Sequence, residues 1–323
     1  MQKDKLNYSN IAKVKKNISP YILDTPLIKN IIQDKVYKDK EIFFKLEFLQ
    51  HAGSFKTRGA FNNILKLNKE QKKRGVVTVS AGNHALAVAY AAKNLNINST
   101  VIMFKSSNKF RVQSAKNYGS KVLIAKNPKH AFDLLSEIAI KERKNIIHPF
   151  EGFNTLQGSA TLGFDICKSF KKLDNIILSV GGGGLIAGVG SIIKQKFPKC
   201  KVIGVEPEGA NGMTKSLLAG KPLKDLKIST IADSLGPPFH LPITFSICQK
   251  IIDEIVTVSD NDMCKGMKFL SSKHKILVEP AAAACTSSLF SSLKNRFINQ
   301  KTLIVICGTN IDLKSWLDLT SKI

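Results

Sequence analysis

The sequence predicts an α/β protein whose strands are mostly parallel. Apolar runs of strand length alternate with helical segments over much of the chain, and several of these runs end in small residues just before a helix begins. Such alternation favours parallel strands that are joined by right-handed crossovers. A length of 323 residues and a hydrophobic content of 43% are sufficient for a substantial core.

The individual elements follow from local patterns. Residues 8–17 have the periodicity of an amphipathic helix, and the aromatic and branched run 42–49 suits a strand. Further strands are expected over 76–79, 99–104, 121–125, 145–148, 175–180, 201–206, 254–259 and 302–307, with helices over 85–95, 109–118, 130–141 and 158–170. We expect residues 74–150 to form a small domain that is inserted into a large one made of residues 1–73 and 151–323.

Composition limits the classes of partner and compartment. The formal net charge is +25, but the basic residues are scattered and have no interleaved aromatic residues, so no nucleic-acid partner is expected. The six cysteines show no CxxC pair, which disfavours disulfides or zinc and fits a reducing cytosol. No signal peptide or membrane-length run is present, so we expect a cytoplasmic protein. The chain stops soon after Trp316, so no C-terminal regulatory domain is expected.

A single lysine is the strongest candidate for covalent chemistry. Lys56 follows the expected strand 42–49 and a break at Gly53-Ser54, where Ser54 is expected to cap the next helix. This places Lys56 in the first helical turn, beside the end of a strand, where α/β sheets bind ligands. The helix N-terminus and the nearby Arg58 are both expected to lower the pKa of the amine, as an attacking lysine requires.

Two further loops each follow an expected strand. Gly181, Gly182, Gly183 and Gly184 precede a helix that starts near Leu185, so their backbone N–H groups can surround a phosphate. The second loop offers amide and hydroxyl groups for a carboxylate or a ring oxygen, and it consists of Ser80, Ala81, Gly82, Asn83 and His84. An amine, a phosphate site and a carboxylate site together indicate a pyridoxal phosphate enzyme that acts on an amino acid.

The glycine loop has a second interpretation. Gly182-x-Gly184-x-x-Ala187 also fits the dinucleotide fingerprint, and Glu206 ends the next strand about where an acid would bind a ribose. A nicotinamide-dependent oxidoreductase is therefore a remote alternative. It gives no role to the other motifs, whereas the pyridoxal phosphate interpretation uses them all.

The motifs resemble, in order, those of the fold-type II pyridoxal phosphate enzymes. They are GSFKTRGA (53–60), SAGNHA (80–85), LQGSATLGFDI (156–166), GGGGLIAG (181–188) and CGTNID (307–312), and the resemblance extends from Thr25 to Asp312. The chain looks most like the threonine (serine) dehydratase branch, close to serine racemase. This resemblance implies a tryptophan synthase β-like fold, with two open, twisted, mostly parallel sheets flanked by helices.

The resemblance also implies roles for single residues. Lys56 would form the Schiff base with pyridoxal 5'-phosphate, Phe55 would pack on its ring and Asn83 would bind the ring hydroxyl. Gly181 to Gly184 and the amide of Leu185 would bind the cofactor phosphate, and Ser80 to His84 the substrate carboxylate. Glu279 resembles a cofactor-side glutamate of the racemases. Helix capping is the alternative role for Asn83 and His84.

Three departures from the family pattern change these expectations. Cys307 stands where most relatives have a serine beside the ring nitrogen, and a neutral thiol there favours prompt loss of a β-leaving group. Alternatively, Cys307 is simply a buried cysteine at a strand end. Ala81 replaces the serine that racemases use as an acid, so racemisation should be weak. Gly212 replaces an acidic residue of a cation site near Glu206 and Ala210, so a divalent or monovalent cation is disfavoured, and Glu206 and Ala210 are its candidate ligands.

The expected activity is that of a threonine/serine ammonia-lyase (dehydratase). Elimination of water from L-threonine or L-serine would give 2-oxobutyrate or pyruvate together with ammonia. The alternatives within this fold are a hydroxyaspartate dehydratase and a serine racemase. Relatives are often dimers or tetramers, so we expect a homodimer or homotetramer that acts on a small amino acid without a membrane partner.

Overall fold

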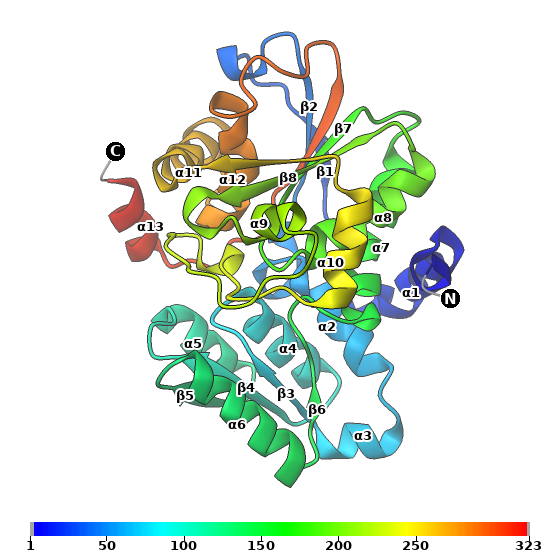
Figure 1. Cartoon of the computed structure of the whole chain (residues 1–323), viewed down its shortest axis with the longest axis vertical. Coiled ribbons are helices and arrows are strands. Elements are labelled where there is room, and N and C mark those ends of the chain that lie inside the picture. The colour runs from blue at the N-terminus through cyan, green and yellow to red at the C-terminus, as the bar shows by residue number, and fades with distance from the viewer. Residues whose placement is uncertain (1–2, 322–323) are drawn as a thin grey trace.

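The computed structural model describes residues 3–321 and contains two sheets stacked along the long axis of the molecule (Figure 1). The strands are β1 (Leu27–Lys29), β2 (Glu41–Lys45), β3 (Val76–Val79), β4 (Ser99–Phe104), β5 (Lys121–Ala125), β6 (Asn145–Ile146), β7 (Asn175–Ser179), β8 (Lys201–Pro207), β9 (Glu254–Val258) and β10 (Lys301–Val305). The helices are α1 (Tyr8–Ile18), α2 (Lys56–Leu65), α3 (Lys69–Arg74), α4 (Asn83–Asn94), α5 (Lys109–Asn117), α6 (Pro128–Lys141), α7 (Phe153–Ser169), α8 (Gly184–Lys196), α9 (Gly212–Leu218), α10 (Pro242–Ile251), α11 (Asp260–His274), α12 (Pro280–Ser287) and α13 (Leu313–Thr320). None of the helices in residues 3–321 has the length and apolar character needed to cross a membrane.

The larger sheet has the strand order β1-β2-β10-β7-β8-β9. Only β1 runs antiparallel to its neighbour, with Leu27 opposite Lys45, and the remaining pairs are parallel. Strand β10 therefore lies between β2 and β7, although its residues come last in the chain. The loops that follow β2, β7 and β10 consequently meet at one edge of this sheet, which is where parallel sheets bind ligands.

The smaller sheet has the order β5-β4-β3-β6 and is entirely parallel. All four of its strands fall within residues 74–150, and Figure 1 shows them with α4, α5 and α6 in the lower half of the molecule. We refer to the parts built on the two sheets as the six-stranded unit and the four-stranded unit. The expected α/β architecture with two mostly parallel sheets is confirmed, and the exact domain boundaries at 74 and 150 stay a prediction.

Close helix packing orients the helix that begins at Lys56. A Cβ atom on Gly158 of α7 would lie 2.4 Å from the Cα atom of Gly59 on α2. On its other side, α7 packs against α8, where a Cβ atom on Gly188 would lie 2.7 Å from the carbonyl oxygen of Leu156. No side chain fits at these two contacts, so the glycines of the LQG and GGGGLIAG motifs allow three helices to pack at backbone distance.

Two local expectations about the Lys56 region are wrong. Strand β2 ends at Lys45 and a 3₁₀ turn covers Glu47–Leu49, so the strand is shorter than the run 42–49 suggested. The N-cap of α2 is Phe55, and the hydroxyl of Ser54 makes no hydrogen bond within the described residues. Tertiary contacts, including the backbone pairing of Ser54 with Gly308, determine the conformation here in place of a local cap.

Candidate active site

The Lys56 side chain lies at the bottom of a cavity between the two units. Its Nζ donates a hydrogen bond of 2.6 Å to the carbonyl oxygen of Pro149 and lies 5.1 Å from the centre of the Phe55 ring. The cavity wall includes Ser80 to His84 from the four-stranded unit and Gly182 from the six-stranded unit. The structure therefore brings the three motifs together around one primary amine.

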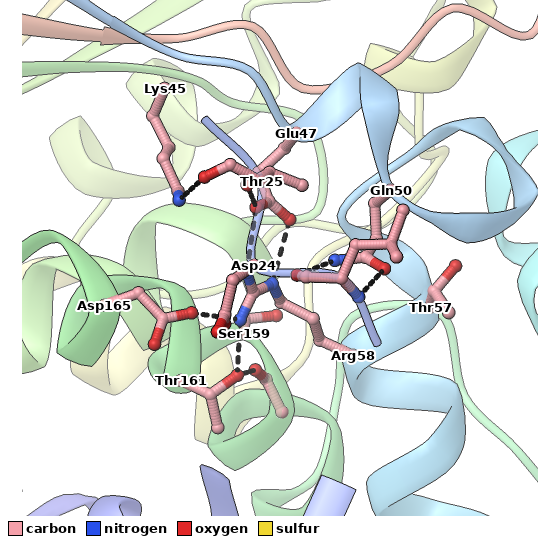
Figure 2. A network of polar contacts seen from close by, with 12 residues as sticks. Asp24, Thr25, Lys45, Glu47, Gln50, Thr57, Arg58, Ser159, Thr161 and Asp165 are labelled. Atoms are coloured by element: carbon pink, nitrogen blue, oxygen red, sulfur yellow. Dashed lines mark hydrogen bonds and ion pairs between the residues drawn. The ribbon is translucent and has the colours of Figure 1, made fainter. Parts of the chain in front are cut away.

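The pKa of Lys56 is lowered to about 8, and burial of the amine is the principal cause. The expected direction is thus correct, but the expected contribution of Arg58 is wrong. Arg58 is fully buried and donates from Nε to Glu47 at 2.8 Å and from Nη1 to Asp165 at 2.8 Å, as Figure 2 shows. Two carboxylates neutralise its charge, so Arg58 holds α2 in place and leaves the Lys56 amine unaffected.

The four-glycine loop connects β7 to α8 beside the same amine. Gly183 has a φ of +84°, and its Cβ atom would lie 2.8 Å from the Cε atom of Met213. A Cβ atom on Gly182 would lie 2.3 Å from the ring of Phe150. The loop is therefore restricted to glycine, and the first N–H groups of α8, which lack partners within the helix, open toward the small cavity that Leu185 also lines.

A buried polar cluster surrounds Asn83. Its Nδ2 donates to Oε1 of Glu279 at 2.5 Å, and its Oδ1 accepts a hydrogen bond of 2.6 Å from Asn310. Asn83 is the first residue of α4, and its side chain does not cap that helix. Burial raises the pKa of Glu279, while Arg111 opposes the increase. The capping interpretation of Asn83 is therefore wrong, because its amide is used in contacts with the six-stranded unit.

Cys307 follows β10 and lines the small cavity together with Phe55 and Glu279. Burial and the carboxylate of Glu279 raise the pKa of its thiol well above the usual value, so the thiol is neutral. The backbone N–H of Phe55 donates to the carbonyl oxygen of Cys307 at 3.1 Å. A neutral thiol, an aromatic ring and the Lys56 amine thus line the same small cavity.

The Ser80–His84 loop follows β3 at the wall of the larger cavity. Nε2 of His84 donates to the carbonyl oxygen of Ile147 at 3.0 Å, and burial lowers the pKa of its ring to about 3. His84 is therefore a neutral ring that connects α4 to the segment after β6, and it does not cap the helix through its side chain. Ser80, Asn83 and His84 are the residues of this loop with polar side chains that line the cavity.

The two candidate cation ligands lie away from the cavity. Glu206 is fully buried, and its oxygens accept hydrogen bonds from the backbone N–H groups of Met213 and Thr214 and from the Thr214 hydroxyl. A Cβ atom on Gly212 would lie 2.6 Å from the Cδ1 atom of Leu226 and 3.0 Å from His240, so these side chains would have to move to admit an acidic residue. Ala210 is also buried, and no metal-binding group of three or more His, Cys, Asp or Glu residues is found within residues 3–321. Because Glu206 is buried and its oxygens already accept hydrogen bonds, it does not offer a carboxylate to a ribose, which the dinucleotide fingerprint requires.

Several residues at the site had no signal in the sequence. Arg111 donates to Glu279, Asp233 and the carbonyl oxygen of Asn310, and it comes from helix α5, whose local pattern is that of an ordinary surface helix. His148 and Pro149 lie between β6 and α7. Among these residues, only Asn310 belongs to one of the sequence motifs, CGTNID (307–312), and this position could have suggested that its side chain contributes to the site.

The residues present fit pyridoxal phosphate. The glycine-restricted loop at the N-terminus of α8 suits a phosphate, the buried amine of low pKa suits an aldehyde, and the neutral thiol of Cys307 suits a ring nitrogen. Lys56, Phe55, Asn83, Glu279 and Cys307 would hold the cofactor together with the glycine loop. When bound, pyridoxal phosphate supplies an aldehyde that condenses with amines and a ring that withdraws electrons from the substrate α-carbon.

Comparison with known proteins agrees with this chemistry. The phenylserine dehydratase of Ralstonia pickettii is 40% identical over 304 residues, which cover 94% of this chain and 93% of that protein. The catabolic L-threonine dehydratase of Staphylococcus aureus (strain USA300) is 33% identical over 95% of this chain and 90% of its own length. The structure of maize serine racemase superposes with a TM-score of 0.90 at 29% identity and covers 98% of both chains. Residues 18–308 match the family model for "Pyridoxal-phosphate dependent enzyme", and the chain therefore belongs to this family, which confirms the expected fold and cofactor.

Proposed function

We propose that this protein is a pyridoxal phosphate-dependent dehydratase of β-hydroxy α-amino acids, with L-threonine and L-serine as substrates. The observation that carries the proposal is the position of the Lys56 amine, which lies between the Ser80–His84 loop and the four-glycine loop and has its pKa lowered to about 8. The Ralstonia pickettii and Staphylococcus aureus relatives are both named as dehydratases, and they match nearly the whole chain.

The Ser80–His84 loop and Lys56 have separate roles in the proposed reaction. The hydroxyl of Ser80 and the backbone N–H groups at the start of α4 bind the substrate carboxylate, which orients the α-carbon toward Lys56. The Lys56 amine would accept the α-proton of the substrate as a general base. Loss of the β-hydroxyl and hydrolysis then give a 2-oxo acid and ammonia. The carbonyl oxygen of Pro149 accepts a hydrogen bond from the free Lys56 amine and would orient it for this proton transfer.

Ammonia release from L-threonine and L-serine tests this proposal. Purified holoenzyme should release ammonia and the 2-oxo acid in equal amounts, and Lys56→Ala should lose both this activity and the cofactor absorbance band. Lys66→Ala, at the C-cap of helix α2 and with its amine bonded to Gln157 and Asn154, is the matched control and should retain both. Ammonia release by Lys56→Ala at the wild-type rate would refute the role of Lys56.

Two properties of the whole protein are part of the proposal. All six cysteines are buried thiols, which supports a reducing compartment such as the cytoplasm. We propose a homodimer or homotetramer because relatives in the family are often dimers or tetramers, and light scattering of the purified protein at several concentrations tests this assignment.

A further inference from the structure

The cavity at Lys56 has two chemically different sets of lining residues. It measures about 330 Å³, and the set that we call the polar end consists of Lys56 and the Ser80–His84 loop. The set that we call the apolar end comes from both units and consists of Phe104, Phe132, Leu135, Ile146, Ile228 and Phe239. A β-hydroxy amino acid that is anchored by its carboxylate and amine at the polar end directs its β-substituent toward the remaining volume.

Aromatic rings connect the two units at the apolar end. The ring centre of Phe132 on α6 lies 5.5 Å from that of Phe239, which precedes α10. Phe239 in turn lies 6.1 Å from Phe150, next to the carbonyl that accepts from Lys56. Ile146 and Ile228, which also line the cavity, remain 49% and 37% exposed. Accessible apolar surface that lines a concave site is typical of a ligand subsite.

The charges at the cavity wall disfavour an acidic β-substituent. Among the described residues that line the cavity, the charged side chains are Lys56 and Asp233. Arg111 contacts Asp233, but it is only 4% exposed, and its guanidinium already donates to Asp233, Glu279 and the carbonyl oxygen of Asn310. It is therefore not available to pair with a ligand. A second substrate carboxylate would therefore meet Asp233 without a cation to pair with it, which would cost affinity.

We infer that the apolar end is a specificity subsite for an aryl or bulky alkyl group on the β-carbon of the substrate. This inference rests on the proposed dehydratase function and assigns the preferred substrate class as β-aryl-β-hydroxy α-amino acids. The methyl group of threonine fills little of the subsite, and 3-hydroxyaspartate is disfavoured because its second carboxylate would meet Asp233. Phe132 and Phe239 determine the preference, because they face one another across the boundary between the two units.

Binding of amino acids that cannot lose a β-hydroxyl tests the subsite independently of turnover. Calorimetric titration of the holoenzyme should give an affinity for L-phenylalanine about 10- to 100-fold higher than for L-alanine, the range expected for burying one aromatic ring. L-Aspartate should bind more weakly than L-alanine. Equal affinities for phenylalanine and alanine, or tighter binding of aspartate, would overturn the inference.

Variants locate the preference within the cavity. Phe132→Ala and Phe239→Ala should each reduce the phenylalanine-to-alanine affinity ratio about tenfold while the alanine affinity changes little. Ile140→Ala is the matched control on helix α6, since Ile140 is 76% exposed and does not line the cavity. If either alanine variant fails to fold, Phe239→Leu keeps the volume but loses the ring and should lower the same ratio. Unchanged ratios in the folded variants would place the preference elsewhere and refute the assignment.

Turnover separates the two proposals. Ammonia release from L-threo-3-phenylserine should exceed that from L-threonine about tenfold in kcat/KM. If threonine is turned over equally well and phenylalanine shows no binding advantage, the dehydratase function stands and the subsite falls. If phenylalanine binds tightly but none of the β-hydroxy amino acids releases ammonia, the subsite stands and the dehydratase function falls.

Discussion

The guanidinium of Arg111 donates a hydrogen bond of 3.2 Å to Oε2 of Glu279, and this pair joins helix α5 of the four-stranded unit to the start of helix α12 in the six-stranded unit. Both side chains are almost fully buried, and Glu279 also accepts from Asn83 at the cavity. This ion pair therefore holds the two units together at a residue that also contacts the cavity around Lys56.

Removal of the Arg111 cation should destabilise the protein strongly. Arg111→Met leaves the buried Glu279 carboxylate without its cation, and such losses typically cost about 3–5 kcal/mol. Adding Glu279→Gln should recover part of this loss, because it removes the unpaired charge. Urea unfolding of the parent protein, the two single variants and the double variant measures the coupling energy between Arg111 and Glu279. Arg296→Met breaks a half-exposed pair with Glu254 and should cost less than about 1 kcal/mol, and an equal cost for both arginines would contradict the prediction.

Cofactor loading should depend on pH through Lys56. Only the neutral amine attacks an aldehyde, and burial lowers the pKa of this amine from 10.5 to about 8. The rate at which the cofactor-free protein takes up pyridoxal phosphate should therefore rise about tenfold per pH unit below pH 8 and level off above it. Absorbance after rapid mixing measures this rate. A rate that continues to rise in the same way up to pH 10 would mean that the amine has its ordinary pKa.

A side chain in the four-glycine loop should weaken phosphate binding. Gly183→Ala adds a Cβ atom where φ is +84° and where Met213 and Cys248 leave no space, so the loop must shift. The dissociation constant for pyridoxal phosphate should increase at least about tenfold, as measured by equilibrium dialysis. Gly220→Ala also places a side chain at positive φ, but in open space, and it should leave cofactor affinity unchanged. Similar losses in both variants would indicate a general folding effect.

Ala81→Ser should introduce racemisation. Ala81 lines the cavity above Lys56, and a hydroxyl at this position could deliver a proton to the substrate that alanine cannot supply. Chiral chromatography of reactions with L-serine should detect D-serine with the variant at a rate at least about tenfold above the parent protein. Ala85→Ser, at a buried position on helix α4 just after this loop that does not line the cavity, is the control. Rapid racemisation by the parent protein would contradict the expected role of Ala81.

Removal of divalent cations should leave activity unchanged. Both oxygens of Glu206 already accept hydrogen bonds at the start of α9, and burial raises the pKa of this carboxyl to about 7, so it is a poor cation ligand at neutral pH. Ammonia release after treatment with EDTA should remain within about twofold of the untreated rate, and added Mg²⁺ should have no larger effect. A loss of activity that Mg²⁺ restores would show a cation site that these residues do not explain.

The predicted decrease in the pKa of Lys56 is correct, but one of its two predicted causes is wrong. The direction of the pKa shift was predicted, but Arg58 was assigned an influence that Glu47 and Asp165 cancel. The Glu47 and Asp165 carboxylates come from segments before and far after α2. A pattern around residue 56 contains no information about these partners, because charge pairing depends on distances that are set by the fold.

Local patterns in the sequence are sufficient to predict the alternation of strands and helices, the glycine loop and Lys56 as the candidate site lysine, since these depend on local periodicity and on backbone conformations that only glycine adopts readily. The surroundings of these features depend on the tertiary fold. Arg111 meets Glu279 across 168 residues of chain, Asn310 meets Asn83 across 227, and the apolar end of the cavity combines Phe132 with Phe239. The physical reason is that hydrogen bonds, ion pairs and ring contacts act over a few ångströms in space, and packing of the two units brings these distant segments within that range.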